Sequence, residues 1–236
     1  MLRPMNRRFV LLAAPFLLAA LTAAAPVKHR AAAPPPKPAP LGDVVRVRIV
    51  TALGPIEVDL DHAHAPLSVE NFVRYVDARR FDGMTFYRAM RLDWGTPPNG
   101  LIQAGLRGDP RKLFKPVAHE PTNVTGVHHT AGAISLARFA PGTATADFSI
   151  LLSDMAGLDA DPKSDNPELQ AGYAAFGHVV SGMDVARKIW DAPLSPTKGE
   201  GFLKGQMLDP PVKVLTVRRV PIPAPVIPAP AATPQP

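Results

Sequence analysis

The chain has 236 residues, of which 46% are hydrophobic and 19% charged, with no cysteine and a formal net charge of +6. Without cysteine it has no disulfide framework, thiol nucleophile, iron–sulfur cluster or cysteine-ligated zinc. The first 25 residues carry three arginines and no acid, so the remainder holds 23 basic and 20 acidic side chains. No basic stripe with interleaved aromatic residues is visible, and we therefore expect no nucleic-acid partner.

Residues 1–25 have the pattern of a secretory signal peptide. Three arginines open the segment, an apolar run over residues 9–21 follows, and three alanines close it. The run is shorter than the about 20 apolar residues that span a bilayer, although an uncleaved anchor is the alternative. We expect a periplasmic or secreted protein, with no stable membrane insertion after signal cleavage.

Two proline-rich segments flank the region expected to fold. Residues 26–41 form a predicted Pro/Ala-rich linker, and residues 221–236 form a predicted disordered tail. Proline removes a backbone donor and fixes φ, so neither segment can join the interior of a sheet or continue a helix. A ligand for a proline-reading partner is the alternative reading of the tail. Residues 42–220 remain as one predicted domain.

This domain opens with a predicted hairpin and a helix. Residues 44–50 and 56–60 are rich in β-branched residues and alternate in polarity, and Gly54-Pro55 forms a turn between them. Pro66 begins a helical segment that extends to residue 78, and its apolar residues recur at helical spacing.

Short apolar runs separated by turn-forming residues fill most of the remaining domain. Six predicted strands lie at residues 84–90, 101–104, 133–137, 148–152, 174–180 and 212–217, and a second predicted helix at residues 184–190. Many short strands, two helices and no alternation of strand and helix predict an all-β fold. We expect a closed β-barrel with helices at its ends.

Several familiar catalytic patterns are missing from the sequence. It contains no Gly-x-Ser-x-Gly, no phosphate-binding Gly-x-x-x-x-Gly-Lys-Ser/Thr and no Gly-x-Gly-x-x-Gly. His62, His64, His128 and His129 have no partners at metal-ligand spacing, and we expect them in solvated turns. The sequence therefore predicts neither a metal nor a cofactor.

Five segments, in order, resemble the motifs of the cyclophilin family of peptidyl-prolyl cis-trans isomerases. They include Phe86-Tyr-Arg88, where the family typically has Phe-His-Arg, and Leu101-Ile-Gln-Ala-Gly105, which resembles Met-Ile-Gln-Gly-Gly. The segments lie at residues 53–72, 81–88, 101–105, 132–150 and 175–185. The resemblance covers residues 44–219 and implies a closed antiparallel eight-stranded β-barrel capped by two α-helices.

The resemblance also implies a site. Arg88 is expected to donate to the prolyl nitrogen during rotation about the X-Pro bond, and Gln103 to hold the substrate backbone. The non-functional alternatives are that Arg88 is a solvated strand arginine and that Gln103 is a polar residue at the barrel rim whose hydrogen bonds are made within the protein. The substrate-binding residues implied by the matching motifs are Tyr87, Leu101, Leu136, Ala137, Arg138, Asp147, Ser149 and Tyr173.

The match departs from the family pattern around the expected proline pocket. Gly100 and Ser149 replace phenylalanines that are typical of that pocket, which predicts a wider and wetter floor. An enlarged loop precedes Gly100, and its Trp94 either replaces the lost wall or packs peripherally. Asp147 is expected on the same strand face as Ser149, with its carboxylate reaching Arg88.

Three functions are compatible with these residues. The first is an exported isomerase, expected to be a monomer, that acts on proline-containing unfolded or loop segments of client proteins. The second is a cyclophilin-like module or chaperone that binds proline peptides with little turnover, as the depleted pocket favours. The third is a proline-tailed scaffold, which rests on the termini alone.

Overall fold

The computed structural model describes residues 40–95 and 98–223. The predicted signal peptide, nearly all of the linker and most of the tail lie outside these residues. Within the described ranges, no helix has the length and apolar character needed to cross a bilayer.

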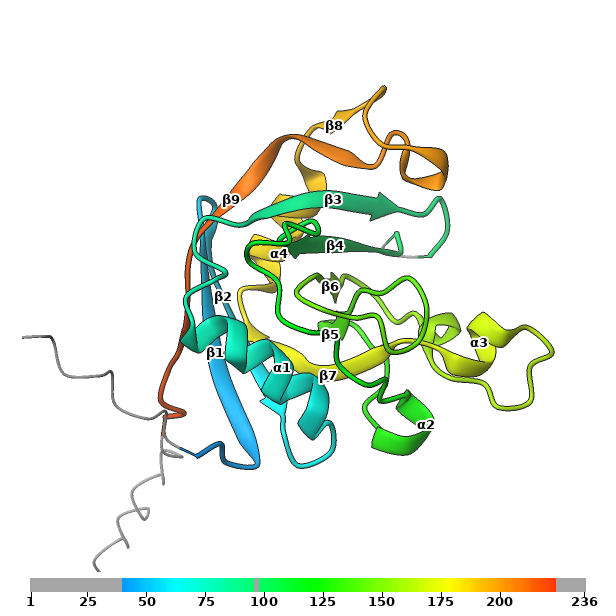
Figure 1. Cartoon of the computed structure of the whole chain (residues 1–236). Helices are drawn as coiled ribbons and strands as arrows, with labels where there is room; N and C mark the ends of the chain where they lie inside the picture. The colour runs from blue at the N-terminus through cyan, green and yellow to red at the C-terminus, as the bar shows by residue number, and fades with distance from the viewer. Residues whose placement is uncertain (1–39, 96–97, 224–236) are drawn as a thin grey trace, which may run out of the picture. The chain divides into compact units, whose positions relative to one another are not determined.

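The described residues form a closed antiparallel barrel (Figure 1). Its strands follow the order β1-β2-β7-β5-β6-β4-β3-β9, and β9 pairs back with β1 to close the ring. The short strand β8 pairs only with the beginning of β9. The strands are β1 (Val44–Thr51), β2 (Gly54–Asp61), β3 (Thr85–Arg91), β4 (Gly100–Gly105), β5 (Ala133–Leu136), β6 (Phe148–Leu151), β7 (Ala174–Ser181), β8 (Leu194–Ser195) and β9 (Met207–Arg219). The predicted eight-stranded barrel is confirmed.

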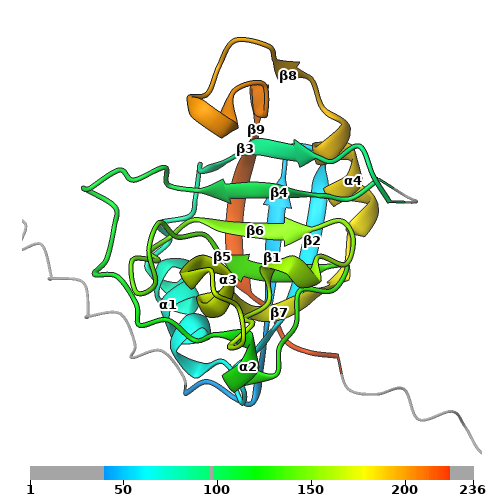
Figure 2. The ribbon, with the colours of Figure 1, turned by 90° about the vertical axis from the view of Figure 1, so that its right-hand side faces the viewer.

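Two helices pack against the barrel where the sequence predicts them. Helix α1 (Pro66–Asp77) packs on β2, β7 and β9, whereas α4 (Met183–Asp191) packs on β2, β3 and β4. Figure 2 shows them at opposite ends of the strands. Two short helices were not predicted: α2 (Thr122–Thr125) and α3 (Pro167–Ala171). Two 3₁₀ turns, η1 (Ala156–Leu158) and η2 (Gly201–Leu203), lie in the loops.

The first hairpin shows how the sequence alternation becomes structure. Val45, Val47 and Ile49 of β1 point into the core, where each is less than 10% exposed. The intervening Arg46 faces outward and donates to both carboxylate oxygens of Asp59 on β2, at 2.6 and 2.8 Å. One face is therefore buried and the other ion-paired, which fixes the strand register.

Helix α1 begins at Pro66, where a missing N–H costs no hydrogen bond. Its N-cap residue, Ala65, offers no side-chain acceptor. The buried carboxylate of Glu120 replaces it, accepting from the backbone N–H groups of Leu67 at 3.0 Å and Ser68 at 2.6 Å. A distant acid thus caps the helix and also complements its positive end.

An aromatic cluster fills the barrel beneath α1. The ring of Phe72 lies 4.9 Å from that of Phe81, 5.2 Å from Phe148 and 5.5 Å from Phe176, measured between centroids. Because Phe148 comes from β6 and Phe176 from β7, one helix residue ties two strands of the wall together. This packing anchors the strands whose outer faces carry the site.

Candidate active site

Strand register places four polar side chains in one row across the outer face of the barrel. Arg88 of β3 pairs with Gln103 of β4, which pairs with Ser149 of β6, which pairs with Ser135 of β5. These four strands lie side by side in Figure 2. Apart from Tyr87, the residues on either side of each of them in the chain lie in the core, since side chains alternate along a strand. Arg88 and Gln103 are therefore neighbours on the same face.

The backbone at Arg88 is irregular. The pairings of β3 with both β4 and β9 shift between Phe86 and Arg88, so Tyr87 occupies a β-bulge. A bulge redirects the side chains beside it. Here Tyr87 is only 8% exposed, with its hydroxyl on Asp147, whereas Arg88 remains on the outer face and half-buried.

Two glutamines fix the Arg88 guanidinium. Its Nη1 donates to Oε1 of Gln103 at 2.8 Å, and its Nε donates to Oε1 of Gln206 at 2.9 Å. No carboxylate in the described ranges forms an ion pair or hydrogen bond with it. Burial lowers the pKa of Arg88, but arginine still keeps its charge in proteins. The guanidinium is thus oriented without being neutralised, and no described residue accepts from Nη2.

An apolar patch adjoins this polar row. Leu101 lies two residues before Gln103, on the same face of β4, and packs with Leu151 and Met155, and Met90 and Leu158 partly cover it. Leu101 is only 6% exposed. The patch therefore supplies an apolar edge to the row, while most of Leu101 itself is covered.

Asp147 requires a correction, because its carboxylate does not reach Arg88. Oδ2 accepts from the hydroxyl of Tyr87 at 2.8 Å, and Oδ1 accepts from the backbone N–H groups of Leu106 at 2.7 Å and Arg107 at 3.1 Å. Burial raises the pKa of Asp147 despite these donors. The carboxylate therefore anchors the end of β4 and holds the bulge residue.

Leu136 also differs from the expectation. It is 3% exposed and belongs to the main core inside the barrel. Because Ser135 faces outward, the next residue must face inward. Leu136 therefore supports the wall and cannot touch a substrate. Tyr87 is likewise occupied, with its ring buried and its hydroxyl on Asp147.

The side chain of Arg138 is occupied by the segment that contains α3. Its guanidinium donates to the backbone oxygen of Gly172 and to Oε2 of Glu168, the latter at 2.9 Å, and lies 4.6 Å from the centroid of the Tyr173 ring. The Arg138 side chain is 1% exposed. It holds the α3 segment against the barrel and is not available to a peptide. Ala137 and Tyr173 remain half-buried near this edge.

The structure explains Gly100 by close packing. A Cβ at Gly100 would lie 2.3 Å from the backbone oxygen of Met90 and 2.5 Å from Nε1 of Trp190. Trp190 donates to that same oxygen at 2.8 Å. Any larger residue at position 100 would therefore collide with α4. Ser149 stays half-buried within the polar row, and Trp94 is 61% exposed.

Three residues that the sequence did not point to contribute to the polar row, two of them at Arg88 and one at Ser135. Gln206 accepts from the guanidinium, and Phe202 of η2 lies with its ring centroid 5.7 Å from the guanidinium carbon. His129 is buried, contrary to the expected solvated turn. It bonds Asp159 at 2.6 Å and the hydroxyl of Ser135 at 2.9 Å. Periodicity gives no signal for these three, because each meets its partner through a loop.

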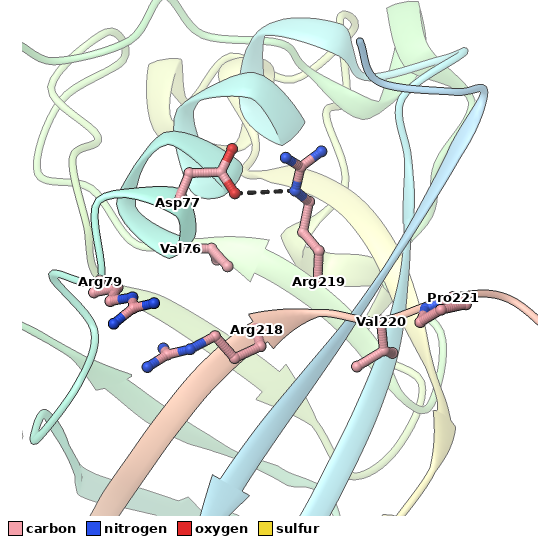
Figure 3. A pocket seen from close by; sticks show the side chains of 7 residues that line it. All are labelled: Val76, Asp77, Arg79, Arg218, Arg219, Val220 and Pro221. Atoms are coloured by element: carbon pink, nitrogen blue, oxygen red, sulfur yellow. Dashed lines mark ion pairs between the residues drawn. The ribbon is translucent and has the colours of Figure 1, made fainter. Parts of the chain in front are cut away.

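A surface pocket of about 500 Å³ lies at the other end of β9 (Figure 3). Arg88 pairs with Met207 at the start of that strand, whereas the pocket is lined by Arg218 and Arg219 at its end. Asp77 pairs with Arg219 at 2.9 Å, and Asp82 pairs with Arg218 at 2.7 Å. These ion pairs join β9 to α1 and the turn after it, so we assign this region a structural role.

The described residues contain no group of three or more histidine or acidic side chains that could hold a metal ion. The site so defined consists of a charged donor on a barrel wall, flanked by amide and hydroxyl groups and an apolar edge. Such an arrangement can bind and polarise a peptide backbone without attacking it.

Comparison with solved structures identifies the fold as the cyclophilin-like barrel. The crystal structure of a cyclophilin type peptidyl-prolyl cis-trans isomerase from Cryptosporidium parvum matches with a TM-score of 0.55 and 17% identity, covering 76% of this chain and 99% of that one. At this identity the likeness concerns the fold alone.

The sequence comparisons establish the family. The model of the cyclophilin type peptidyl-prolyl cis-trans isomerase/CLD family matches residues 46–218. A peptidyl-prolyl cis-trans isomerase of Acinetobacter baylyi is 34% identical over 73% of this chain and 84% of its own length. Peptidyl-prolyl cis-trans isomerase A of Dickeya dadantii is 37% identical over 61% and 70%. The chain belongs to the cyclophilin-type peptidyl-prolyl isomerases, a family of enzymes.

Proposed function

We propose that the protein accelerates rotation about X-Pro bonds in unfolded or loop segments of exported proteins, with Arg88 as the catalytic donor and Gln103 holding the substrate backbone. One observation carries this proposal. The half-buried guanidinium of Arg88 is fixed by two neutral amide oxygens and has no carboxylate partner among the described residues. A charge held in this way is ready to donate to a ligand.

The chemistry requires little more than such a donor. The barrier to rotation, about 18 to 20 kcal/mol, comes from amide resonance. In the twisted state the prolyl nitrogen regains its lone pair, and a donor aimed at that atom binds the transition state better than either planar isomer. No bond is made or broken, so the reaction needs no nucleophile, metal or cofactor.

Other groups on the same face support substrate binding. Gln103 uses its oxygen to hold Arg88, so its amide N–H groups are directed to the substrate carbonyl. Ser149, next to it in register, offers a hydroxyl. Tyr173 and Ala137 border the row on the side of β5 and β7. A solved relative from Cryptosporidium parvum, determined in the presence of the dipeptide Ala-Pro, supports the choice of proline peptides as ligands.

The cellular setting is also part of the proposal. The basic, then apolar, then alanine-rich order of residues 1–25 favours export to the periplasm or beyond. We propose that the mature protein acts as a monomer on proline-containing clients, without nucleic acid and without stable membrane insertion.

The test is Arg88→Ala, assayed for cis-trans exchange of a proline peptide. A charge-assisted hydrogen bond contributes about 1.5 to 3 kcal/mol, so kcat/KM should fall about tenfold to a hundredfold. Arg48→Ala is the matched control, because Arg48 is an outward strand arginine that pairs with Glu57 on another part of the barrel. Full activity of Arg88→Ala would refute the assignment.

The alternative, a binding module with little turnover, is favoured by Ser149 in the polar row. A hydroxyl at that position offers less apolar surface to a pyrrolidine ring than an aromatic side chain does. This function predicts that the parent protein binds a proline peptide while the exchange rate stays at its uncatalysed value. Titration of the protein with a proline peptide, followed by NMR, measures both binding and the exchange rate and so separates the two functions.

A further inference from the structure

The segment between β8 and β9 borders the candidate site, although its residues are remote in sequence. It is drawn in orange beside β3 in Figures 1 and 2. Its 3₁₀ turn η2 carries Phe202, and its last residue before β9 is Gln206. These two residues are linked, because Nε2 of Gln206 donates to the backbone oxygen of Phe202 at 2.8 Å. The other end of the same amide accepts from Arg88 at 2.9 Å.

This arrangement gives Gln206 a defined task. Its amide oxygen faces Arg88 and its amide nitrogen faces the turn, so one side chain relates the position of the guanidinium to that of the turn. Arg88 Nε has no other acceptor among the described residues. Without Gln206, only the bond to Gln103 would hold the guanidinium, and rotation about that single contact would be permitted.

Phe202 is far more exposed than the aromatic residues of the core. It is 79% exposed, yet its ring lies 5.7 Å from the guanidinium carbon of Arg88. The contact of an exposed aromatic ring with water is unfavourable, and an apolar group bound against the ring would remove that contact. The ring is therefore placed where a ligand of Arg88 would meet it.

The polar row lacks an aromatic surface of its own. Position 100 has no room for a side chain, because Trp190 and the Met90 carbonyl occupy the space. Ser149 contributes a hydroxyl. Phe202, on the segment before β9, therefore supplies an aromatic ring next to Arg88 that positions 100 and 149 do not supply.

We infer that residues 201–206 form the outer wall of the substrate groove, in which Phe202 is a specificity-determining residue and Gln206 a positioning residue for Arg88. Phe202 contacts an apolar side chain next to the target proline, and the preferred substrates are X-Pro segments with a large apolar residue at X. This inference rests on the proposed role of Arg88.

The substrate preference is tested with two peptides that differ only before proline, Leu-Pro and Gly-Pro, using NMR exchange so that no coupling protease restricts the sequence. Phe202→Ala should raise KM for the Leu-Pro peptide about fivefold and change KM for Gly-Pro less than about twofold. Val124→Ala, a similarly exposed apolar residue on the remote helix α2, should change neither. An equal effect of Phe202→Ala on both peptides, or none on either, would overturn the assignment of Phe202.

The positioning role is tested with Gln206→Met, which keeps the length of the side chain but removes the acceptor, and with Gln206→Glu, which keeps the acceptor. Gln206→Met should lower kcat about tenfold with little change in KM, and should shift the ¹⁵N resonance of Arg88 Nε. Gln206→Glu should also leave kcat below that of the parent, because a carboxylate bonded to the guanidinium cancels its charge and cannot donate to the backbone oxygen of Phe202. A parental kcat and an unshifted Nε resonance in Gln206→Met would overturn this role.

Arg88→Ala, measured in parallel, separates this inference from the proposed function. If Arg88→Ala is inactive while the variants at positions 202 and 206 behave as the parent, the segment is irrelevant and the role of Arg88 stands. If Arg88→Ala is fully active, the role of Arg88 fails and the inference built on it fails as well.

Discussion

Replacement of Asp147 by alanine should destabilise the barrel without acting on Arg88 directly. The carboxylate accepts hydrogen bonds from the Tyr87 hydroxyl and from the backbone N–H groups of Leu106 and Arg107. It also folds over Gly105, where a Cβ would lie 2.0 Å from Oδ1. Asp147→Ala removes all three bonds and leaves the Arg88 contacts with Gln103 and Gln206 in place.

The size of the destabilisation depends on which donors are left without an acceptor and cannot bind water instead. Tyr87 and Leu106 are each 8% exposed, so their donors are stranded, whereas the Arg107 N–H is exposed and can bind water. Each stranded donor costs about 1 to 3 kcal/mol. The desolvation of the carboxylate that raises the pKa of Asp147 offsets part of this. We expect a net loss of about 2 to 4 kcal/mol, which lowers Tm by about 5 to 15 °C.

Thermal unfolding and isomerase kinetics, measured below the transition, together test this reasoning. Asp147→Ala should show the lower Tm, and its folded fraction should retain kcat/KM within about threefold of the parent. Tyr87→Phe removes one bond and leaves Oδ2 of Asp147 without that donor, but Oδ1 keeps both backbone N–H groups, so the loss should be smaller, about 1 to 2 kcal/mol. A parental Tm with a large fall in kcat would refute the assignment, because it would mean that Asp147 acts through Arg88.

Three further predictions concern stability. Glu120→Ala removes both acceptors at the start of α1 and should lower the free energy of unfolding by about 1 to 2 kcal/mol, read by urea denaturation. Gly100→Ala should cost about 1 to 3 kcal/mol through collision with Trp190, so a larger residue at position 100 should not deepen the groove; a parental Tm would contradict this. Burial lowers the pKa of His129 below 6.5, although the hydrogen bond that its ring donates to Asp159 opposes this shift. The unfolded chain therefore binds that proton more tightly, and stability is lost as pH falls below about 6.5; His129→Gln should flatten the pH dependence of unfolding between about pH 5 and 7.

The local elements were predictable because their signals are local. Alternation of buried and outward residues defined β1 and β2, and Pro66 followed by apolar residues at helical spacing defined α1. The matching motifs also placed Arg88 and Gln103 together, and the register of β3 and β4 makes them direct neighbours. Strand pairing converts such patterns into geometry with few alternatives.

The predictions were wrong in two situations: where the alternation of a strand was extended beyond the end of that strand, and where a loop distant in sequence supplied the hydrogen-bond partner of a side chain. Asp147 was assigned to the face of Ser149 by the period of two, but β6 begins only at Phe148, so that rule does not apply to it. His129 was expected in solvent, but Asp159, thirty positions later, covers and bonds it. Arg138 was expected at the substrate, but the α3 segment occupies its guanidinium.

The position of Asp147 has a consequence for the chemistry proposed at Arg88. A carboxylate bonded to the guanidinium would have satisfied two of its donors and cancelled its charge, which weakens any donation to a prolyl nitrogen. Amide oxygens orient the same group and leave the charge intact. In this fold the carboxylate of Asp147 bonds Tyr87 and the end of β4, whereas two glutamines bond Arg88. The acid therefore has a structural role and does not neutralise the donor. For this reason a glutamate at position 103 should lower turnover even though it would bind Arg88 more tightly.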